Sequence, residues 1–308
     1  MTTLAAPPTD AATTTLQLLG YAPDDRVLII HADDVGFSHA SNVAAFEAMS
    51  AGSLTCCSTL VPAPWFMETA ALQRQHPGAD IGIHMTLTAE YETYRWRSLT
   101  GRPSLHAPDG GMWRDVASVV AHVSTEDARA ELRAQVEHAL ASGIDVTHLD
   151  THMGAVIGPK YIAPYVDLAV EFRLPLFFIR PSDRRLDALG DGAAAYLEQA
   201  RRLDALGWPL LDHAIHRTLS EIEPDDKDAR FREFFAGLRP GLTHFLVHPA
   251  KGGEELDAMT PADCRHRAKE YELFRRPDLR AYCESLGIKL TGYREIRDRL
   301  RASLKATA

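Results

Sequence analysis

Ionisable side chains follow five apolar runs in this sequence, each at the point where the run ends. The five run ends read His31-Ala32-Asp33-Asp34, Ile83-His84, His148-Leu149-Asp150-Thr151-His152, Arg180-Pro181 and Val247-His248-Pro249. A single polar residue at such a position is equally well explained as a helix cap, because Asp is a preferred N-cap residue. Its repetition after five separate runs favours a functional site that the runs build together.

Asp33 and Asp34 are adjacent, and two neighbouring carboxylates raise the pKa of at least one of them unless a cation neutralises them. A metal ion held by one Asp, with the other left free as a base, resolves this conflict. One carboxylate and two neutral imidazoles form the three-ligand set of hydrolytic Zn²⁺ sites, which keep positions open for water and substrate. Asp34, His84 and His152 fit this set. Three nearby residues are candidates to hydrogen-bond the ligands from behind: His31, His148 and Asp150.

Apolar runs and helical spacing alternate along the chain, and this alternation must bring the run ends together. The runs predict buried strands at residues 26–32, 54–61, 81–84, 146–149, 176–179, 210–211, 243–247 and 288–290. Six or more βα units favour a single-domain α/β fold of the (β/α) barrel type, with an open doubly wound sheet as the alternative. In such barrels the catalytic side chains lie at the C-terminal ends of the strands, where the polar run ends fall.

Two stretches depart from this alternation. We expect residues 1–22 to form an N-terminal extension that is partly flexible, and residues 23–308 to form the barrel domain. The section 88–119 is polar and rich in Gly and Pro, and it predicts a long excursion. Its tryptophans, Trp96 and Trp113, are better explained by burial of this loop than by ligand binding.

The composition excludes several classes of protein. The 308 residues contain 33 Lys+Arg against 42 Asp+Glu, a formal net charge of −9 that argues against a nucleic-acid partner. No apolar run approaches the roughly 20 residues of a membrane span, so we expect no membrane partner. The four cysteines form no CxxC pair, and the first twenty residues lack Lys, Arg and a long apolar core. These features predict a cytoplasmic location.

Four motifs stand in a characteristic order along the chain. They are ADDVG at 32–36, GIHMTLT at 82–88, THLDTH at 147–152 and VHP at 247–249, followed by a tail at 267–290 that ends in YCESLGIKL. The motifs resemble those of the YdjC-like (ChbG/HpnK) carbohydrate deacetylases, and the likeness spans residues 27–291. The resemblance implies a deformed (β/α) barrel akin to the polysaccharide deacetylases. It also implies one divalent metal ion, Zn²⁺ or Mg²⁺, that serves the removal of acetyl groups from N-acetylated amino sugars.

The resemblance assigns roles to individual residues. It implies three metal ligands: Asp34, His84 and His152. Asp33 is then the general base that takes a proton from the attacking water, and His248 is the general acid that protonates the leaving amine. Arg180, through a shorter match, is similar to an arginine that orients the base.

The sequence departs from the family pattern in two places. Val35 stands where Phe usually follows the Asp pair, and residues 153–155 (MGA) replace a His-rich continuation after His152. These differences leave the three ligands intact and leave the acetylated sugar or oligosaccharide undefined. The presence of both Asp33 and His248 disfavours a non-catalytic sugar-binding relative. Another metal-dependent sugar-processing enzyme, such as an isomerase or a phosphoesterase, remains an alternative, and the oligomeric state, including a homodimer, stays open.

Overall fold

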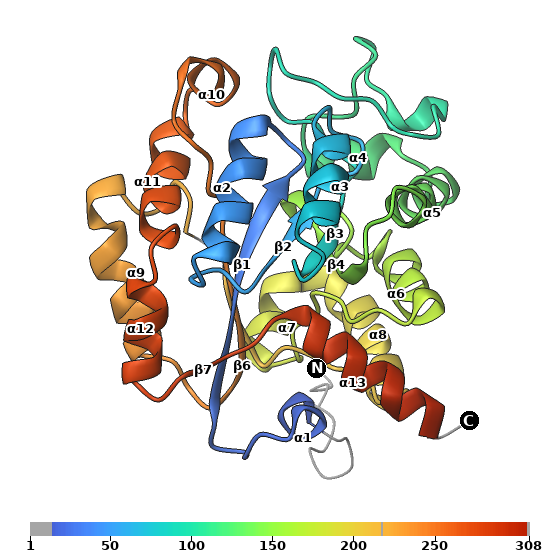
Figure 1. Cartoon of the computed structure of the whole chain (residues 1–308). Coiled ribbons are helices and arrows are strands. Elements are labelled where there is room, and N and C mark those ends of the chain that lie inside the picture. The colour runs from blue at the N-terminus through green and yellow to red at the C-terminus, as the bar shows by residue number, and fades with distance from the viewer. Residues whose placement is uncertain (1–13, 217, 307–308) are drawn as a thin grey trace.

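A seven-stranded parallel sheet forms the centre of the computed structural model, which describes residues 14–216 and 218–306 (Figure 1). The strand order is β4-β3-β2-β1-β6-β5, and β7 pairs with the first half of β1. The strands are β1 (Arg26–Val35), β2 (Cys56–Thr59), β3 (Ile81–Met85), β4 (Val146–Thr151), β5 (His213–Ile215), β6 (Gly241–Val247) and β7 (Lys289–Leu290). All their carboxyl ends therefore point to one rim.

Two isolated parallel bridges connect the edges of this sheet, Leu149 with Leu176 and Ile179 with Leu211. The Tyr196 hydroxyl donates to the carbonyl of Ile179 at 2.6 Å and accepts from its N–H at 3.1 Å. The backbone of Ile179 is therefore bonded to a side chain where a regular strand would continue its backbone hydrogen bonds to the next strand. The two predicted strands that contain these residues are thus reduced to single bridges. The sheet nevertheless curls round rather than staying open, which confirms the predicted deformed (β/α) barrel in a single domain.

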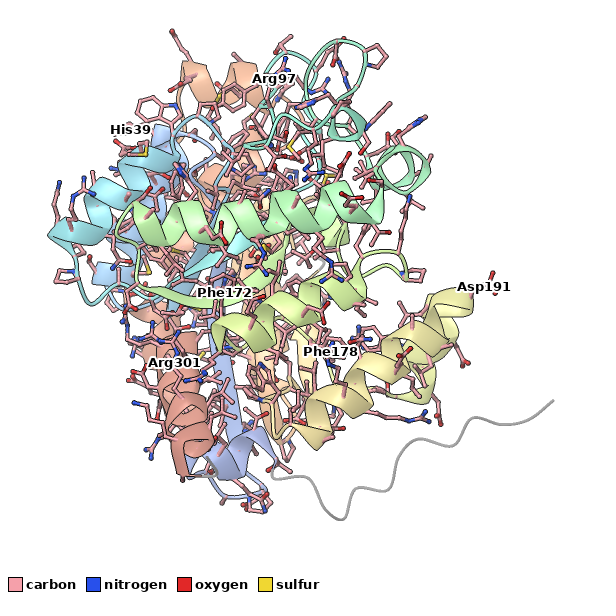
Figure 2. The ribbon with its side chains drawn as sticks, turned by 90° about the vertical axis from the view of Figure 1, so that its right-hand side faces the viewer. His39, Arg97, Phe172, Phe178, Asp191 and Arg301 are labelled. Atoms are coloured by element: carbon pink, nitrogen blue, oxygen red, sulfur yellow. The ribbon has the colours of Figure 1, made fainter. Side chains whose placement is uncertain are left out.

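Helices cover the outside of the barrel (Figure 1). They are α1 (Thr15–Leu19), α2 (His39–Ser50), α3 (Phe66–Gln75), α4 (Val116–His122), α5 (Thr125–Ala141), α6 (Ile162–Phe172), α7 (Asp183–Leu189), α8 (Ala193–Ala205), α9 (Lys227–Ala236), α10 (Glu254–Met259), α11 (Cys264–Phe274), α12 (Asp278–Ser285) and α13 (Tyr293–Ala306), with short 3-10 turns η1 (Pro103–Leu105), η2 (His152–Gly154), η3 (Gly190–Gly192) and η4 (Pro224–Asp226). Helices α5 and α6 lie side by side across the front of Figure 2. Arg133 of α5 pairs with Glu171 of α6 at 2.8 Å. Arg301 of α13 donates to the carbonyl of Phe172 at 3.4 Å and so attaches the last helix to α6.

The alternation of side chains along β1 divides the interior into two environments. Leu28, Ile30 and Ala32 pack outward into the large core between sheet and helices, and Val27 and Ile29 pack inward with α1 and α13. Because successive residues of a strand point to opposite faces, the next inward positions are residues 31 and 33. The barrel interior is therefore apolar near the N-terminal ends of the strands and ionisable near their carboxyl ends.

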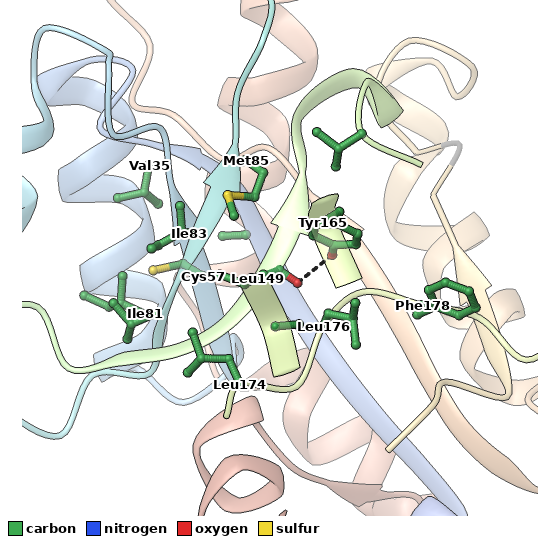
Figure 3. Packing of buried hydrophobic residues seen from close by; sticks show 14 of the residues in the cluster. Val35, Cys57, Ile81, Ile83, Met85, Leu149, Tyr165, Leu174, Leu176 and Phe178 are labelled. Carbon is green, nitrogen blue, oxygen red and sulfur yellow. Dashed lines mark hydrogen bonds between the residues drawn. The ribbon is translucent and has the colours of Figure 1, made fainter. Parts of the chain in front are cut away.

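The large core between the sheet and the helices packs against the strands whose carboxyl ends carry the ionisable residues. Figure 3 shows Ile83 and Met85 of β3 packed near Leu149 of β4 and Tyr165 of α6, all of them buried. The Tyr165 hydroxyl donates to the carbonyl of Leu149 at 2.9 Å, so the single polar atom of this side chain is satisfied. Removal of this apolar surface from water, worth about 25 cal/mol per Å², is the main stabilising term for such a layer.

The described part of the predicted N-terminal extension packs against the barrel, whereas residues 1–13 lie outside the described range. Helix α1 buries Leu16 and Leu19, and the Thr15 hydroxyl donates to the carbonyl of Leu210 at 2.6 Å. Helix α1 is therefore attached to the barrel by apolar packing and by this hydrogen bond. Within residues 14–216 and 218–306, no helix is long and apolar enough to cross a bilayer.

The predicted excursion at 88–119 lies at the top of Figure 1 and contains η1 and the start of α4. Trp96 is buried with Phe37 in a small apolar cluster, and Trp113 stacks on His122 with ring centroids 4.1 Å apart. The Trp113 indole also donates to the carbonyl of Ser104 at 2.8 Å. Both tryptophans therefore pack the excursion against its neighbouring segments, as expected.

Candidate metal centre and active site

The registers of two strand pairs bring the predicted site residues to one rim. Ala32 of β1 lies opposite Val247 of β6. The residues that follow them, Asp33 and His248, are therefore neighbours. On the other side, His84 of β3 lies opposite Asp150 of β4, and the chain turns into η2 two residues later. The turn begins at His152 and places its ring beside that of His84, with centroids 5.1 Å apart.

A local irregularity of β1 directs both adjacent carboxylates into the site. In a regular strand Asp33 and Asp34 would point to opposite faces of the sheet. The pairing with β2 is instead irregular between Ala32 and Val35, and Asp34 has a φ of 62°. Asp is one of the residues that tolerate this left-handed conformation. The result is that both carboxylates face His84 Nε2, at 3.7 Å for Asp33 and 3.4 Å for Asp34.

Asp34, His84 and His152 form a buried three-residue cluster whose facing atoms fit a cation. Asp34 Oδ1 lies 3.4 Å from His84 Nε2 and 3.4 Å from His152 Nδ1. Ligand atoms about 2.0–2.2 Å from a tetrahedral Zn²⁺ ion are separated by roughly 3.3–3.6 Å, so the spacing matches. Among the described residues, Asp34 Oδ1 has no hydrogen-bond partner although it is buried. A buried acceptor facing two imidazole nitrogens is what such an ion would complete.

The other oxygen of Asp34 is occupied by an arginine from α11. Arg267 Nη2 donates to Asp34 Oδ2 at 2.8 Å and to the Tyr91 hydroxyl at 3.0 Å, and both charged side chains are buried. Burial alone would raise the pKa of Asp34, but Arg267 and the two histidines of the cluster lower it well below its usual value. Asp34 is therefore ionised, with one oxygen fixed and one oxygen available.

Each histidine of the cluster is oriented by a carboxylate at its far nitrogen. His84 Nδ1 contacts Asp150, whose second oxygen accepts from Ser58 Oγ at 3.0 Å, and His152 Nε2 lies 2.9 Å from Glu90 Oε2. Burial alone would lower the pKa of His152, but Glu90 and Asp34 raise it to about 9. Carboxylates that hold the far nitrogen of a ligating histidine are typical of metal sites. They leave one nitrogen of each ring directed at Asp34.

Asp33 is held in place without using both of its oxygens. His31 Nδ1 lies 2.7 Å from Asp33 Oδ1, while Asp33 Oδ2 lies 3.7 Å from His84 Nε2 and 3.8 Å from His248 Nε2. Burial alone would raise the pKa of Asp33, but His84 and His31 lower it below its usual value. An ionised carboxylate with one oxygen between the cluster and a second imidazole has the geometry of a general base.

Another set of neighbouring ligand atoms belongs to His31, His148 and Asp150, and it does not fit an ion. His31 Nε2 and His148 Nε2 are 2.8 Å apart, a direct hydrogen bond. Nitrogens that bind a tetrahedral ion at about 2.0–2.1 Å lie roughly 3.3–3.4 Å apart, so two nitrogens that are bonded to each other at 2.8 Å do not fit such an ion. His31 and His148 thus form a hydrogen-bonded row behind Asp33. Of the three residues expected to hydrogen-bond the ligands from behind, Asp150 is the one that contacts a proposed ligand, His84.

The structure does not bring Arg180 to this cluster. Its guanidinium pairs with Asp204 of α8 at 3.1 Å and with Asp212 at 3.6 Å, and no hydrogen bond or ion pair joins it to Asp33 among the described residues. Asp212 accepts from the backbone N–H of Leu242, near the start of β6, whereas His248 follows the end of that strand. The contact to the base that was expected of Arg180 is made instead by His31.

Three charged residues of the site were not assigned from the sequence: Glu90, Arg267 and Glu270. Arg267 is 233 positions from its partner Asp34, and Glu90 is 62 positions from His152. Glu270 accepts from the backbone N–H of His248 at 2.6 Å. The one sequence signal for Arg267 and Glu270 was the likeness of the tail at 267–290, which did not specify contacts, and Glu90 lies outside that tail.

A cleft of about 550 Å³ opens elsewhere on the molecule. It is lined by residues around the N-terminal ends of the strands, among them Asp80, Arg280, Gly292 and Glu295. None of the residues of the metal cluster lines it. The cleft is therefore not part of the candidate active site.

The contact between Arg267 and Asp34 makes a testable prediction about stability. We expect Arg267→Met to lower the free energy of unfolding of the metal-free protein by about 3–5 kcal/mol, because it leaves a buried carboxylate unpaired. Urea unfolding measures this loss, and an added divalent cation recovers part of it by binding only the folded state. The matched control is Arg275→Met, an exposed position on the C-cap of α11, with an expected change below about 0.5 kcal/mol. Equal stability of the two variants would contradict the prediction.

The barrel and its rim of two imidazoles and two carboxylates define a class of protein, the α/β barrels with a candidate metal centre at the carboxyl ends of the strands. Comparison with known proteins gives the family. The chain belongs to the YdjC-like protein family, whose model matches residues 27–285.

Individual relatives agree with this assignment. A carbohydrate deacetylase of Thermus thermophilus is 31% identical over 256 residues, which cover 83% of this chain and 88% of the relative. A carbohydrate deacetylase of Geobacillus stearothermophilus is 27% identical and covers 88% of this chain and 98% of its own. A solved structure from Enterococcus faecalis, whose description proposes cellobiose-phosphate cleavage, has a TM-score of 0.71 at 23% identity and covers 87% of this chain and 98% of its own. The last likeness supports the fold alone.

Proposed function

We propose that this protein is a metal-dependent hydrolase that removes acetyl groups from N-acetylated amino sugars or their oligosaccharides. The observation that carries the proposal is the position of Asp33 Oδ2, 3.7 Å from a nitrogen of the metal cluster and 3.8 Å from His248 Nε2. A base and an acid on adjoining strands beside a cation site are the groups that amide hydrolysis needs. The two relatives named carbohydrate deacetylases support a sugar as the carrier of the acetyl group.

The proposed metal ligands are Asp34, His84 and His152. Two imidazoles and one carboxylate suit Zn²⁺ better than Mg²⁺, which prefers oxygen ligands, so we propose Zn²⁺. When bound, this cation supplies a Lewis acid for the acetyl carbonyl and for the negative charge that develops on its oxygen.

The proton transfers fall to side chains of this chain. Asp33 Oδ2 accepts a proton from the attacking water, while His31 holds Asp33 Oδ1 and keeps the free oxygen directed into the site. His248 Nε2 donates a proton to the nitrogen of the sugar as the carbon–nitrogen bond breaks, because an unprotonated amine is a poor leaving group. The products are acetate and the free amino sugar.

Acetate release tests the proposal. Protein freed of metal by a chelator is supplied with Zn²⁺ or Mg²⁺ and incubated with N-acetylglucosamine and its oligomers, and free acetate is measured by an enzyme-coupled assay. We expect acetate with cation and a return to background with chelator. Isomerisation of a sugar, or phosphate release from a sugar phosphate, without any acetate would favour the alternative metal-dependent enzyme.

A further inference from the structure

The backbone of His248 is held by a buried carboxylate on α11. His248 N–H donates to Glu270 Oε2 at 2.6 Å, and Glu270 is fully buried. Pro249 follows directly, and a residue before proline is restricted to extended backbone conformations. The position of the His248 ring is thus set by its own restricted backbone and by the place of the Glu270 carboxylate.

The second oxygen of Glu270 is occupied by a buried lysine. Lys227 Nζ, at the start of α9, donates to Glu270 Oε1 at 2.6 Å and also to the carbonyls of Thr218 and Leu219. Both charged side chains have an exposed fraction of 0%. All three ammonium protons of Lys227 can be used, and both Glu270 oxygens accept a hydrogen bond. The carboxylate is therefore fixed from one side by Lys227 and fixes His248 on the other.

Stability alone gives a weak reason for this arrangement. A buried ion pair is often no more stabilising than well-packed apolar side chains of similar volume. In this pair, however, Glu270 also accepts from the backbone N–H of His248, whose ring faces Asp33. The connection from Lys227 through Glu270 to His248 also needs two acceptors, because Lys227 Nζ and His248 N–H are both donors. An ionised carboxylate of this length supplies both acceptors.

We infer that Glu270 is a positioning residue for His248, with Lys227 holding Glu270 in register; the inference rests on the proposed function of His248 as the acid. The same helix reaches the site at a second point. Arg267, three residues before Glu270, contacts Asp34, and its carbonyl accepts from the N–H of Ala250 at 3.2 Å. Helix α11 therefore places the acid relative to the metal ligand, and catalysis is sensitive to shifts of about 1 Å between such groups.

The test is a double-mutant cycle on acetate release. In Glu270→Gln, the amide nitrogen of Gln must face either Lys227 or His248 N–H, both of them donors, so one bond is lost. We expect kcat to fall about 10–100-fold with KM within about twofold. In a His248→Ala background, Glu270→Gln should have less than about a twofold further effect, since there is no acid left to misplace. Effects that multiply in the double variant would overturn the inference, because general damage to the fold or to the metal site acts in both backgrounds.

A rescue variant and a control keep the test independent of folding. Lys227→Met combined with Glu270→Gln removes the competing donor, so Gln can turn its oxygen to His248, and kcat should return toward wild type. The matched control is Glu47→Gln. Glu47 accepts from Lys251, in the loop that follows His248, at 2.7 Å and does not contact His248 itself. The kcat of this variant should stay within about twofold of wild type. A rescue variant that is folded but no faster than Glu270→Gln would also overturn the inference.

Crystal structures separate this inference from the proposed function. If the wild-type protein releases no acetate, the proposed function fails, whatever the variants do. The position of the ring can still be read from crystals of the wild type and of Glu270→Gln. The inference predicts that His248 Nε2 moves away from Asp33 Oδ2 relative to the 3.8 Å seen here. An unmoved ring in Glu270→Gln would contradict it.

Discussion

Asp33→Asn lowers kcat for acetate release by about 10²–10⁴-fold while leaving bound metal unchanged, if Asp33 is the general base. The amide oxygen of Asn can still accept from His31 Nδ1, which lies 2.7 Å from Asp33 Oδ1, so the local hydrogen bond survives. The substitution removes the basicity of the group facing His248 and leaves its shape nearly unchanged. Acetate release under saturating sugar, with metal content measured on the same sample, gives both values.

The adjacent carboxylate provides the matched comparison. Asp34→Asn weakens a proposed metal ligand, so we expect metal content to fall together with activity. The two variants differ by one position in the chain and separate a base from a ligand. An Asp33→Asn protein that keeps activity near wild type would show that another group takes the proton.

His84→Ala and His152→Ala should each lower the affinity for the cation by more than about 100-fold. The loss of a group that merely orients a ligand typically costs 10–100-fold, and the loss of the ligand itself costs more. Each variant also leaves a carboxylate, Asp150 or Glu90, without its histidine partner. Metal content after dialysis against a known free concentration of Zn²⁺ measures the effect, and acetate release should fall with it.

The control for these variants is His122→Ala. His122 is exposed and stacks on Trp113 outside the cluster, so its removal should leave metal content at the wild-type level. Wild-type metal content in both His84→Ala and His152→Ala would show that the cation lies elsewhere. Loss in only one of them would reduce the site to two protein ligands.

Much of the rim could be predicted from the sequence because it depends on local signals. An apolar run followed by Asp, His or His-Pro identifies a parallel strand and its carboxyl end, and parallel strands bring these ends to one side. The strands that carry Asp33, His84 and His248 were predicted in this way. Their grouping within a few ångströms then follows from the strand registers.

The local signal failed where the barrel is irregular. The run at 176–179 is apolar, like a strand, but Tyr196 bonds the backbone of Ile179, and the segment makes single bridges. Arg180, at its end, therefore points to Asp204 and Asp212. Nothing in the order of residues distinguishes such a segment from a regular strand.

The contacts that helix α11 makes with the site could not be predicted from the sequence. Glu270 and Arg267 lie three residues apart on α11. Charged residues at this spacing are common on solvent-exposed helices, so the spacing alone does not indicate a buried site. That these two positions face the barrel is decided by the packing of the whole helix against α2 and α9. The left-handed backbone at Asp34, which directs two adjacent carboxylates to the same side, is equally a product of the folded sheet.

We propose that one divalent cation, held by Asp34, His84 and His152, serves deacetylation of an amino sugar. The most direct measurement is a titration of metal-free protein with Zn²⁺ in which bound cation per chain and acetate release from an N-acetylglucosamine oligomer are followed together. We expect acetate release to rise with bound cation and to reach its plateau at one cation per chain. Full acetate release by the metal-free protein, or stoichiometric cation binding with no acetate from any acetylated amino sugar, would contradict it.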